Sequence, residues 1–153
     1  MSVESIKKVL EQYGILDNYV EFPASSETVA LAAEQIGCEP GKIAKTLSFK
    51  MGEGAIVVVA MGTSRVDNKK FKSTFSTKAK FLNPDEVVEL TGCPVGGVCP
   101  FDLPENVKIY LDESLKQYDE VYPAAGAKNN AVLISLPMLE KITGGEWVDV
   151  CSC

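Results

Sequence analysis

A run of apolar residues at positions 55–61, rich in valine, constrains the fold of this chain more than any other stretch. It is far shorter than the roughly 20 apolar residues that a membrane-spanning helix needs. A strand that shows no alternation of polar and apolar residues is covered on both faces. Gly52-Glu53-Gly54, directly before the run, is a hairpin turn signal. The run therefore predicts the central strand of a sheet that is covered on both sides.

Short strand and helix signals alternate along the rest of the 153 residues. The clearest helix start is Asn83-Pro84-Asp85-Glu86, a capping residue followed by proline and two acids near the positive end of the helix dipole. Further strands are predicted at 19–22, 43–50, 107–111, 120–122, 131–135 and 147–150, and Ser25 or Ser26, Asn68 and Asp112 are predicted to begin helices. Seven or eight short strands interleaved with short helices predict a mixed α/β (α+β) fold rather than a regular doubly wound sheet. A chain of this length is expected to fold as one domain, 1–153.

The chain contains no histidine, which limits the chemistry that it can perform. A Ser-His-Asp or Cys-His catalytic unit is excluded. Any enzyme built from this sequence must use lysine, a carboxylate, backbone donors, the substrate's own groups or a cofactor.

Five cysteines are present: Cys38, Cys93, Cys99, Cys151 and Cys153. The N-terminus lacks the apolar core of a secretory signal, so a cytoplasmic protein with reduced thiols is expected. Without histidine, a structural zinc site would need four thiolates together. We therefore expect neither a metal nor a cofactor.

Charge is unevenly distributed around a net value of −6. Residues 1–80 carry 11 basic and 9 acidic side chains, whereas residues 81–153 carry 4 basic and 12 acidic ones. The basic side chains concentrate in one segment that holds only Asp67 as an acid: Arg65, Lys69, Lys70, Lys72, Lys78 and Lys80. Such a run is either a solvated face or a local phosphate-binding strip.

A loop at positions 92–101 holds three glycines, two prolines and no charge. Flexible linkers avoid the Val, Cys and Phe side chains found here, because such side chains favour burial. Gly96-Gly97 allows a ligand to approach the main chain closely. The loop is either a buried turn between two strands or a rigid loop whose backbone N–H groups face a bound polar group.

Lys45 lies in the predicted strand at 43–50, whose alternation places it on the same face as Ile43, Leu47 and Phe49. An ammonium group on an apolar face is costly unless a pocket or a partner receives it. The alternative is that the strand begins only at Thr46 and leaves Lys45 in a solvated turn. Lys45 is therefore a candidate functional residue.

Three segments follow one another in a fixed order: 39–47, which ends in Lys45-Thr46-Leu47, then 91–101, and then Ala125-Gly126 with a strand and Pro137 after it. Together they resemble the YbaK and prolyl-tRNA-synthetase-associated editing-domain family over nearly the whole chain. The resemblance implies a barrel-like mixed sheet of about six to eight short strands with flanking helices.

The same resemblance implies hydrolysis of mischarged aminoacyl-tRNA, since family members typically remove alanine or cysteine from tRNA for proline. By motif, Lys45 matches the family's functional lysine, Gly96 and Gly97 match the loop at the aminoacyl ester, and Gly126 matches the small-residue loop opposite. Around these residues we expect Thr46, Gly62, Val98 and Cys99 to bind substrate, although family sequences often have Ser in place of Cys99. Asn129-Asn130 stands where family sequences have a more basic segment.

This chemistry suits a chain without histidine. An aminoacyl ester is already activated, so its hydrolysis needs charge stabilisation and positioning more than a strong base. Backbone N–H groups of Gly97 and Val98 can hold the developing oxyanion, at roughly 3–4 kcal/mol per well-placed donor. Lys45 can hold the ester or the terminal phosphate as a point charge. Water, or the ribose hydroxyl beside the ester, would supply the remaining group, and a cysteinyl substrate's own thiol can attack instead.

Two other hypotheses stay open. A non-catalytic module that binds charged tRNA or a synthetase would use the basic residues Lys69, Lys70 and Lys72 as its RNA contacts. A thiol or metal protein rests on the cysteines alone. The expected partners are an aminoacyl-tRNA, with tRNA for proline favoured, and a prolyl-tRNA synthetase, with no membrane and no DNA.

Overall fold

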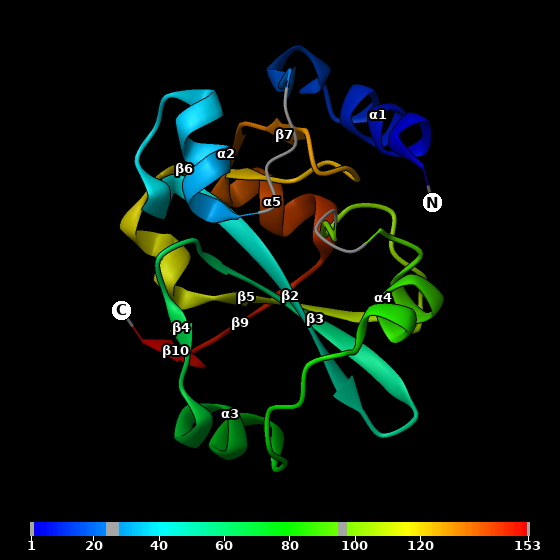
Figure 1. Cartoon of the computed structure of the whole chain (residues 1–153), viewed down its shortest axis with the longest axis vertical. Coiled ribbons are helices and arrows are strands. Elements are labelled where there is room, and N and C mark those ends of the chain that lie inside the picture. The colour runs from blue at the N-terminus through cyan, green and yellow to red at the C-terminus, as the bar shows by residue number, and fades with distance from the viewer. Residues whose placement is uncertain (1, 24–27, 95–97, 153) are drawn as a thin grey trace.

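A six-stranded mixed sheet forms the centre of the computed structural model, which describes residues 2–23, 28–94 and 98–152. Its longest strands are β2 (Ile43–Met51) and β3 (Gly54–Met61), an antiparallel hairpin that runs diagonally through the molecule (Figure 1). Every residue of β3 after Gly54 is buried. The predicted central strand is therefore confirmed.

The remaining strands of the sheet extend it on both sides in the order β8-β6-β2-β3-β5-β9. β5 (Lys108–Asp112) runs parallel to β3, and β9 (Glu146–Val148) runs parallel to β5. On the other side, β6 (Glu120–Pro123) is parallel to β2, and β8 (Ile134–Ser135) is antiparallel to β6. The sheet curls into a half-barrel with helices around it, which confirms the expected mixed, barrel-like fold (Figure 1).

Two small sheets complete the strands of the described residues. β1 (Tyr19–Glu21) pairs with β7 (Asn130–Val132), and β4 (Arg65–Val66) pairs with β10 (Cys151–Ser152). The single strand predicted at 131–135 was wrong, because its two halves join different sheets. The backbone N–H of Leu133, between them, donates to the carbonyl of Asn18.

The described helices are α1 (Val3–Gln12), α2 (Val29–Ile36), α3 (Asn68–Phe75), α4 (Pro84–Thr91) and α5 (Leu136–Thr143), with short 3₁₀ turns η1 (Leu16–Asn18), η2 (Pro40–Lys42) and η3 (Glu113–Gln117). The predicted start of α4 is confirmed, because Asn83 and Glu86 cap each other reciprocally. Two predicted caps were wrong. Thr28 caps α2, while Ser25 and Ser26 lie outside the described residues, and Asp67 caps α3 in place of Asn68.

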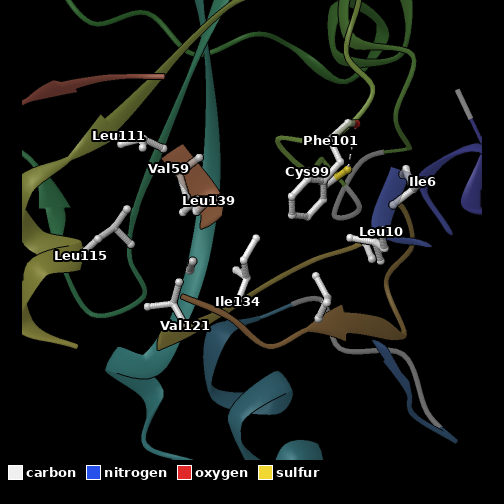
Figure 2. Close-up of a cluster of buried hydrophobic side chains, with 13 residues drawn as sticks. Ile6, Leu10, Val59, Cys99, Phe101, Leu111, Leu115, Val121, Ile134 and Leu139 are labelled. Carbon is white, nitrogen blue, oxygen red and sulfur yellow. Dashed lines mark hydrogen bonds between the residues drawn. The ribbon is translucent and has the colours of Figure 1, made fainter. Parts of the chain in front are cut away.

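Apolar side chains cover both faces of β3. On one side Val59 packs with Leu111, Val121 and Leu139, and α1 adds further apolar side chains to this cluster (Figure 2). On the other side Ile56, Val58 and Ala60 pack against α3 and the C-terminal residues 150–151. Burying a valine side chain fully stabilises the fold by roughly 1.5–3 kcal/mol, so a run of them anchors the sheet.

Candidate functional site

The outer edge of β2, opposite β3, is paired at both ends and open in the middle. Ile43 and Ala44 pair with β6, while Phe49 forms a bridge with Phe81, whose segment also exchanges backbone hydrogen bonds with Ser48 and Lys50. Among the described residues, no strand pairs with positions 45–47 on this edge. Backbone groups alternate in direction along a strand, so the N–H and C=O of Thr46 point to the same open edge as the Ser48 carbonyl.

A pocket of about 200 Å³ lies at this gap. Its walls come from α2, the first residues of β2, the loop residue Val98, and the segment that follows β6. Small side chains leave the space open, since five of the lining residues are alanines: Ala32, Ala44, Ala124, Ala127 and Ala131. Lys45, Thr46 and Asn130 supply the polar groups that the site needs to orient a ligand.

Lys45 lies within β2, which begins at Ile43, so the alternative of a solvated turn is wrong. It pairs with Ala60, a residue of the cluster beneath α3, and therefore shares the apolar face with Leu47 and Phe49. Its Nζ donates a hydrogen bond to the backbone carbonyl of Ser64. Among the described residues, no carboxylate forms an ion pair with it.

Burial is the main cause that lowers the pKa of Lys45. The nearby Cys151 thiol opposes this shift and the Arg65 guanidinium adds to it. A half-buried ammonium without a carboxylate partner is an attractive site for an anionic or strongly polar group of a ligand.

Thr46 adds a second polar feature. Its Oγ1 is buried and makes no hydrogen bond with any described residue. A buried hydroxyl without a partner costs roughly 1–3 kcal/mol, so a polar ligand group that reaches it recovers that energy.

Asn130 organises the part of the pocket wall formed by the segment after β6. The side chain is 4% exposed, and its Oδ1 accepts from the backbone N–H of Ala125 at 3.0 Å and of Ala127 at 3.2 Å. Its Nδ2 donates to the carbonyl of Ala125 at 3.2 Å and to the hydroxyl of Tyr19 at 3.1 Å. Sequence reasoning gave Asn130 no role in the site. The one available signal was an amide directly after a loop of small residues.

Two glycines expected at the site lie in positions where packing leaves no room for a Cβ. Gly126 has φ +98°, and a Cβ there would lie 2.5 Å from Cδ1 of Ile6 on α1. A Cβ on Gly62 would lie 2.5 Å from the carbonyl oxygen of Pro40. Neither glycine lines the pocket, whereas Ala124 and Ala127, on either side of Gly126, do.

Only part of the glycine-rich loop can be placed. Gly96 and Gly97 lie outside the described residues. Val98 lines the pocket and packs against the cluster that contains Leu82. Cys99 is fully buried in the main core next to Phe101 and does not line the pocket (Figure 2). A hydrogen bond with the Cys93 thiol, together with burial, raises the pKa of Cys99 well above its usual range, which is typical of an unreactive core thiol.

The basic residues of α3 are separate from the pocket. In Figure 1, α3 lies at the end of the molecule far from α2. Lys69 and Lys72 are exposed, but Lys70 donates to Oδ1 of Asp149 and to the carbonyl of Cys151, each at 3.0 Å. The hydrogen bond with Asp149 raises the pKa of Lys70. Lys70 therefore holds the C-terminal segment.

The part of the chain that the structure describes lacks both a cluster of metal-ligand side chains and a membrane-spanning helix. It contains no cluster of three or more His, Cys, Asp or Glu side chains suited to a metal ion. None of its helices is both long enough and apolar enough to cross a bilayer.

The half-barrel and its polar pocket define a class of small α+β domain with a small pocket at an open strand edge. Residues 24–142 match the model of the aminoacyl-tRNA editing domain, and the chain belongs to this family. The resemblance in the sequence to YbaK-type editing domains is thereby confirmed.

Relatives and solved structures agree with this assignment. The chain is 44% identical to "Uncharacterized protein YwhH" of Bacillus subtilis (strain 168), over 99% of this chain and 98% of that protein. It is 26% identical to "Putative Cys-tRNA(Pro)/Cys-tRNA(Cys) deacylase EbsC" of Enterococcus faecalis, over 94% of this chain and 90% of that protein. A crystal structure described as "a putative trans-editing enzyme for prolyl tRNA synthetase" superposes with a TM-score of 0.87 at 32% identity, over 99% and 97% of the two chains.

Proposed function

We propose that this chain, as a single domain over 1–153, is a trans-acting deacylase that hydrolyses mischarged aminoacyl-tRNA. The observation that carries the proposal is Lys45, a half-buried ammonium group at a small pocket on an open strand edge. The relationship to proteins named "Putative Cys-tRNA(Pro)/Cys-tRNA(Cys) deacylase EbsC" and "a putative trans-editing enzyme for prolyl tRNA synthetase" supports tRNA for proline as the carrier.

The pocket favours a small aminoacyl group such as alanine or cysteine. Its volume of about 200 Å³ is below the range of typical pockets for drug-sized ligands. Alanines form much of its wall, and the Asn130 hydrogen bonds hold Ala125 and Ala127 in place. Discrimination between acyl groups that differ by one methylene is worth about 1–3 kcal/mol, so the exact wall positions decide which amino acid is removed.

In the proposed reaction, Lys45 holds the ester oxygen or the terminal phosphate, and Thr46 presents polar groups at the open edge. Backbone N–H groups of Gly97 and Val98 stabilise the oxyanion, and Gly96, the residue before them, contributes to substrate binding. Water attacks the carbonyl carbon, the ribose hydroxyl beside the ester relays its proton, and the tRNA hydroxyl leaves with that proton. A cysteinyl substrate's own thiol can attack in place of water: its S–C bond forms as the ester C–O bond breaks, its proton goes to the leaving tRNA hydroxyl, and the amino acid leaves as a cyclic thioester. No step requires a metal ion.

The first test is a deacylation panel with alanine, cysteine, serine and proline, each charged on tRNA for proline. Lys45→Ala is expected to lower kcat/KM on the preferred substrate by about 10²-fold or more, because a charge that stabilises the transition state is lost. Lys8→Ala, at an exposed lysine of α1 outside the pocket, is the matched control.

Circular dichroism of both variants establishes that the fold survives. Wild-type rates in Lys45→Ala would contradict the role given to this residue. Failure of the wild type to hydrolyse any member of the panel would contradict the deacylase itself.

A second candidate is a non-catalytic module that binds charged tRNA or a synthetase. The exposed Lys69 and Lys72 favour it, because they form no ion pair within the described part of the chain. Salt-dependent tRNA binding without turnover on any charged tRNA would support this candidate over the deacylase.

A further inference from the structure

Phe81 presents an aromatic ring to solvent beside the open edge of β2. It is 57% exposed, whereas the other phenylalanines of the chain are buried or half-buried. Its segment borders the gap in which the pocket lies, since the Leu82 N–H donates to the carbonyl of Ser48 at 3.2 Å. One face of this ring packs on the core, and more than half of its surface is left to solvent.

The ring is held rigidly from below. Its centroid lies 4.7 Å from that of Phe49, with 30° between the two planes, and Phe49 lies 4.8 Å from Phe71 beneath it. The backbone is fixed on both sides, because Lys50 N–H donates to the Lys80 carbonyl at 2.8 Å and Leu82 is buried. A ring that is already immobilised loses little conformational entropy when a flat group stacks on its outer face.

Basic side chains precede this ring in the sequence. Lys72, Lys78 and Lys80 are exposed, and within the described residues none of them forms an ion pair. The net charge of the whole chain is −6, so this segment is positive on a protein that is otherwise acidic. An anionic partner is therefore favoured here, and a partner that is both anionic and flat-faced matches the ring as well.

Unpaired RNA has these two properties, because its bases stack on aromatic side chains while its phosphates contact lysines. The distance from Phe81 to the pocket also matches the length of a short RNA segment. Phe81 pairs with Phe49, which is four residues along β2 from Lys45, or about 13 Å at 3.3 Å per residue. About four stacked nucleotides, at 3.4 Å each, or fewer extended ones span this length.

We propose that Phe81 is a base-stacking platform for an unpaired nucleotide a few positions before the RNA end that enters the pocket, with Lys78 and Lys80 holding its phosphates. The proposal deepens the proposed function, on which it rests for the direction of the RNA. It commits to RNA as the occupant of this surface rather than a protein partner or a second copy of the chain.

The test measures binding of uncharged tRNA for proline by fluorescence anisotropy, at fixed salt. Phe81→Ala is expected to weaken binding about 5- to 150-fold, the range for removing one base–aromatic stack. Phe81→Trp retains the platform and is expected to bind within about 2-fold of the wild type. Val88→Ala, which removes a 54%-exposed apolar side chain from α4, is the matched control. In Lys78→Ala/Lys80→Ala the slope of log K against log salt falls by about 0.7 per lost contact.

Kinetics separate the platform from a structural role. The loss of kcat/KM in Phe81→Ala is expected to appear in KM and to be larger for charged tRNA than for aminoacyl-adenosine, which is too short to reach Phe81. Equal losses on the two substrates, or wild-type affinity for uncharged tRNA in Phe81→Ala, would overturn the platform. A change of oligomeric state in place of a change in tRNA affinity would assign Phe81 to a protein contact and overturn it too.

The binding assay needs no turnover, so the two proposals fail separately. tRNA binding that depends on Phe81, with no hydrolysis of any charged tRNA, keeps the platform and removes the deacylase. Hydrolysis of charged tRNA that is unchanged in Phe81→Ala keeps the deacylase and removes the platform.

Discussion

Lys45 carries a charge where a charge is costly to the fold. It lies on an apolar strand face, donates to the Ser64 carbonyl, and has its pKa lowered mainly by burial. Asn130, which lines the same pocket, is the opposite case, since its buried amide has a hydrogen-bond partner for each of its polar atoms. The pocket therefore combines a fully hydrogen-bonded amide with a half-buried charge that burial disfavours.

Removal of the Lys45 charge is expected to preserve or raise stability. The lowered pKa means that the folded state binds fewer protons than the unfolded state just below the ordinary lysine value of 10.5. The free energy of unfolding therefore rises with pH between the lowered pKa and 10.5, because deprotonation of Lys45 removes the cost of burying its charge. At pH 7 this cost is fully present. In Lys45→Met the penalty is absent at every pH.

Urea unfolding of wild type and Lys45→Met at pH 7 and pH 10 measures this effect, with Lys8→Met as the control for removal of an exposed lysine. We expect the variant to be at least as stable as the wild type at pH 7 and its advantage to shrink at pH 10. A variant clearly less stable than wild type at pH 7 would mean that the Ser64 hydrogen bond outweighs desolvation.

At the scale of single elements, helix ends are fixed by side chains that accept free backbone N–H groups. Asn83 does this for α4 through a reciprocal box with Glu86. Asp67 does it for α3, accepting from the N–H groups of Lys69 at 3.0 Å and Lys70 at 3.1 Å. Both Asp67 and Asn68 suit a cap by residue type, so the sequence did not separate them.

This pair gives a sharp stability test. Asp67→Ala is expected to lower the free energy of unfolding by about 1 kcal/mol, because two N–H groups lose their acceptor. Asn68→Ala, one residue later and inside the helix, is expected to stay within about 0.5 kcal/mol of wild type. Chemical denaturation of both variants measures the difference. A larger loss of stability in Asn68→Ala than in Asp67→Ala would show that Asn68 caps the helix.

At the scale of the whole molecule, the N-terminal helix is fastened to a loop more than a hundred residues later. Gly126 lies against Ile6, whose side chain is fully buried in the main core (Figure 2). The same loop is held by Asn130, which in turn contacts Tyr19 of β1. Packing of α1 thus supports the wall of the candidate pocket from behind.

Gly126→Ala is expected to lower the free energy of unfolding by about 2–4 kcal/mol, through its positive φ and the contact with Ile6 together. Gly14→Ala is the matched control, because Gly14 has φ +74° but no atom within 4 Å of its added Cβ. It is expected to cost only about 1 kcal/mol, from backbone conformation alone. Urea unfolding of both variants isolates the packing contribution. Equal losses in the free energy of unfolding would show that the Ile6 side chain can move aside without destabilising the fold.

Sequence reasoning reached part of the site. Strand alternation placed Lys45 on the apolar face, and Thr46 and Val98 do line the pocket. It did not find Ala32, Ala124 or Asn130, which come from α2 and from the segment after β6. Local patterns specify periodicity within one element, but they hold no information on which distant elements meet at an edge.

By itself, the sequence determined the central strand, the starts of α4 and η3, and the exclusion of histidine chemistry, because each follows from residue type and local spacing. Tertiary structure decided the rest. The strand predicted at 131–135 divided because its halves pair in different sheets, and neighbours from distant segments pack closely against Gly62, Gly126 and Cys99. The open edge of β2 exists for the same reason: β6 and the Phe81 segment each cover one end of the strand, so its middle faces the pocket.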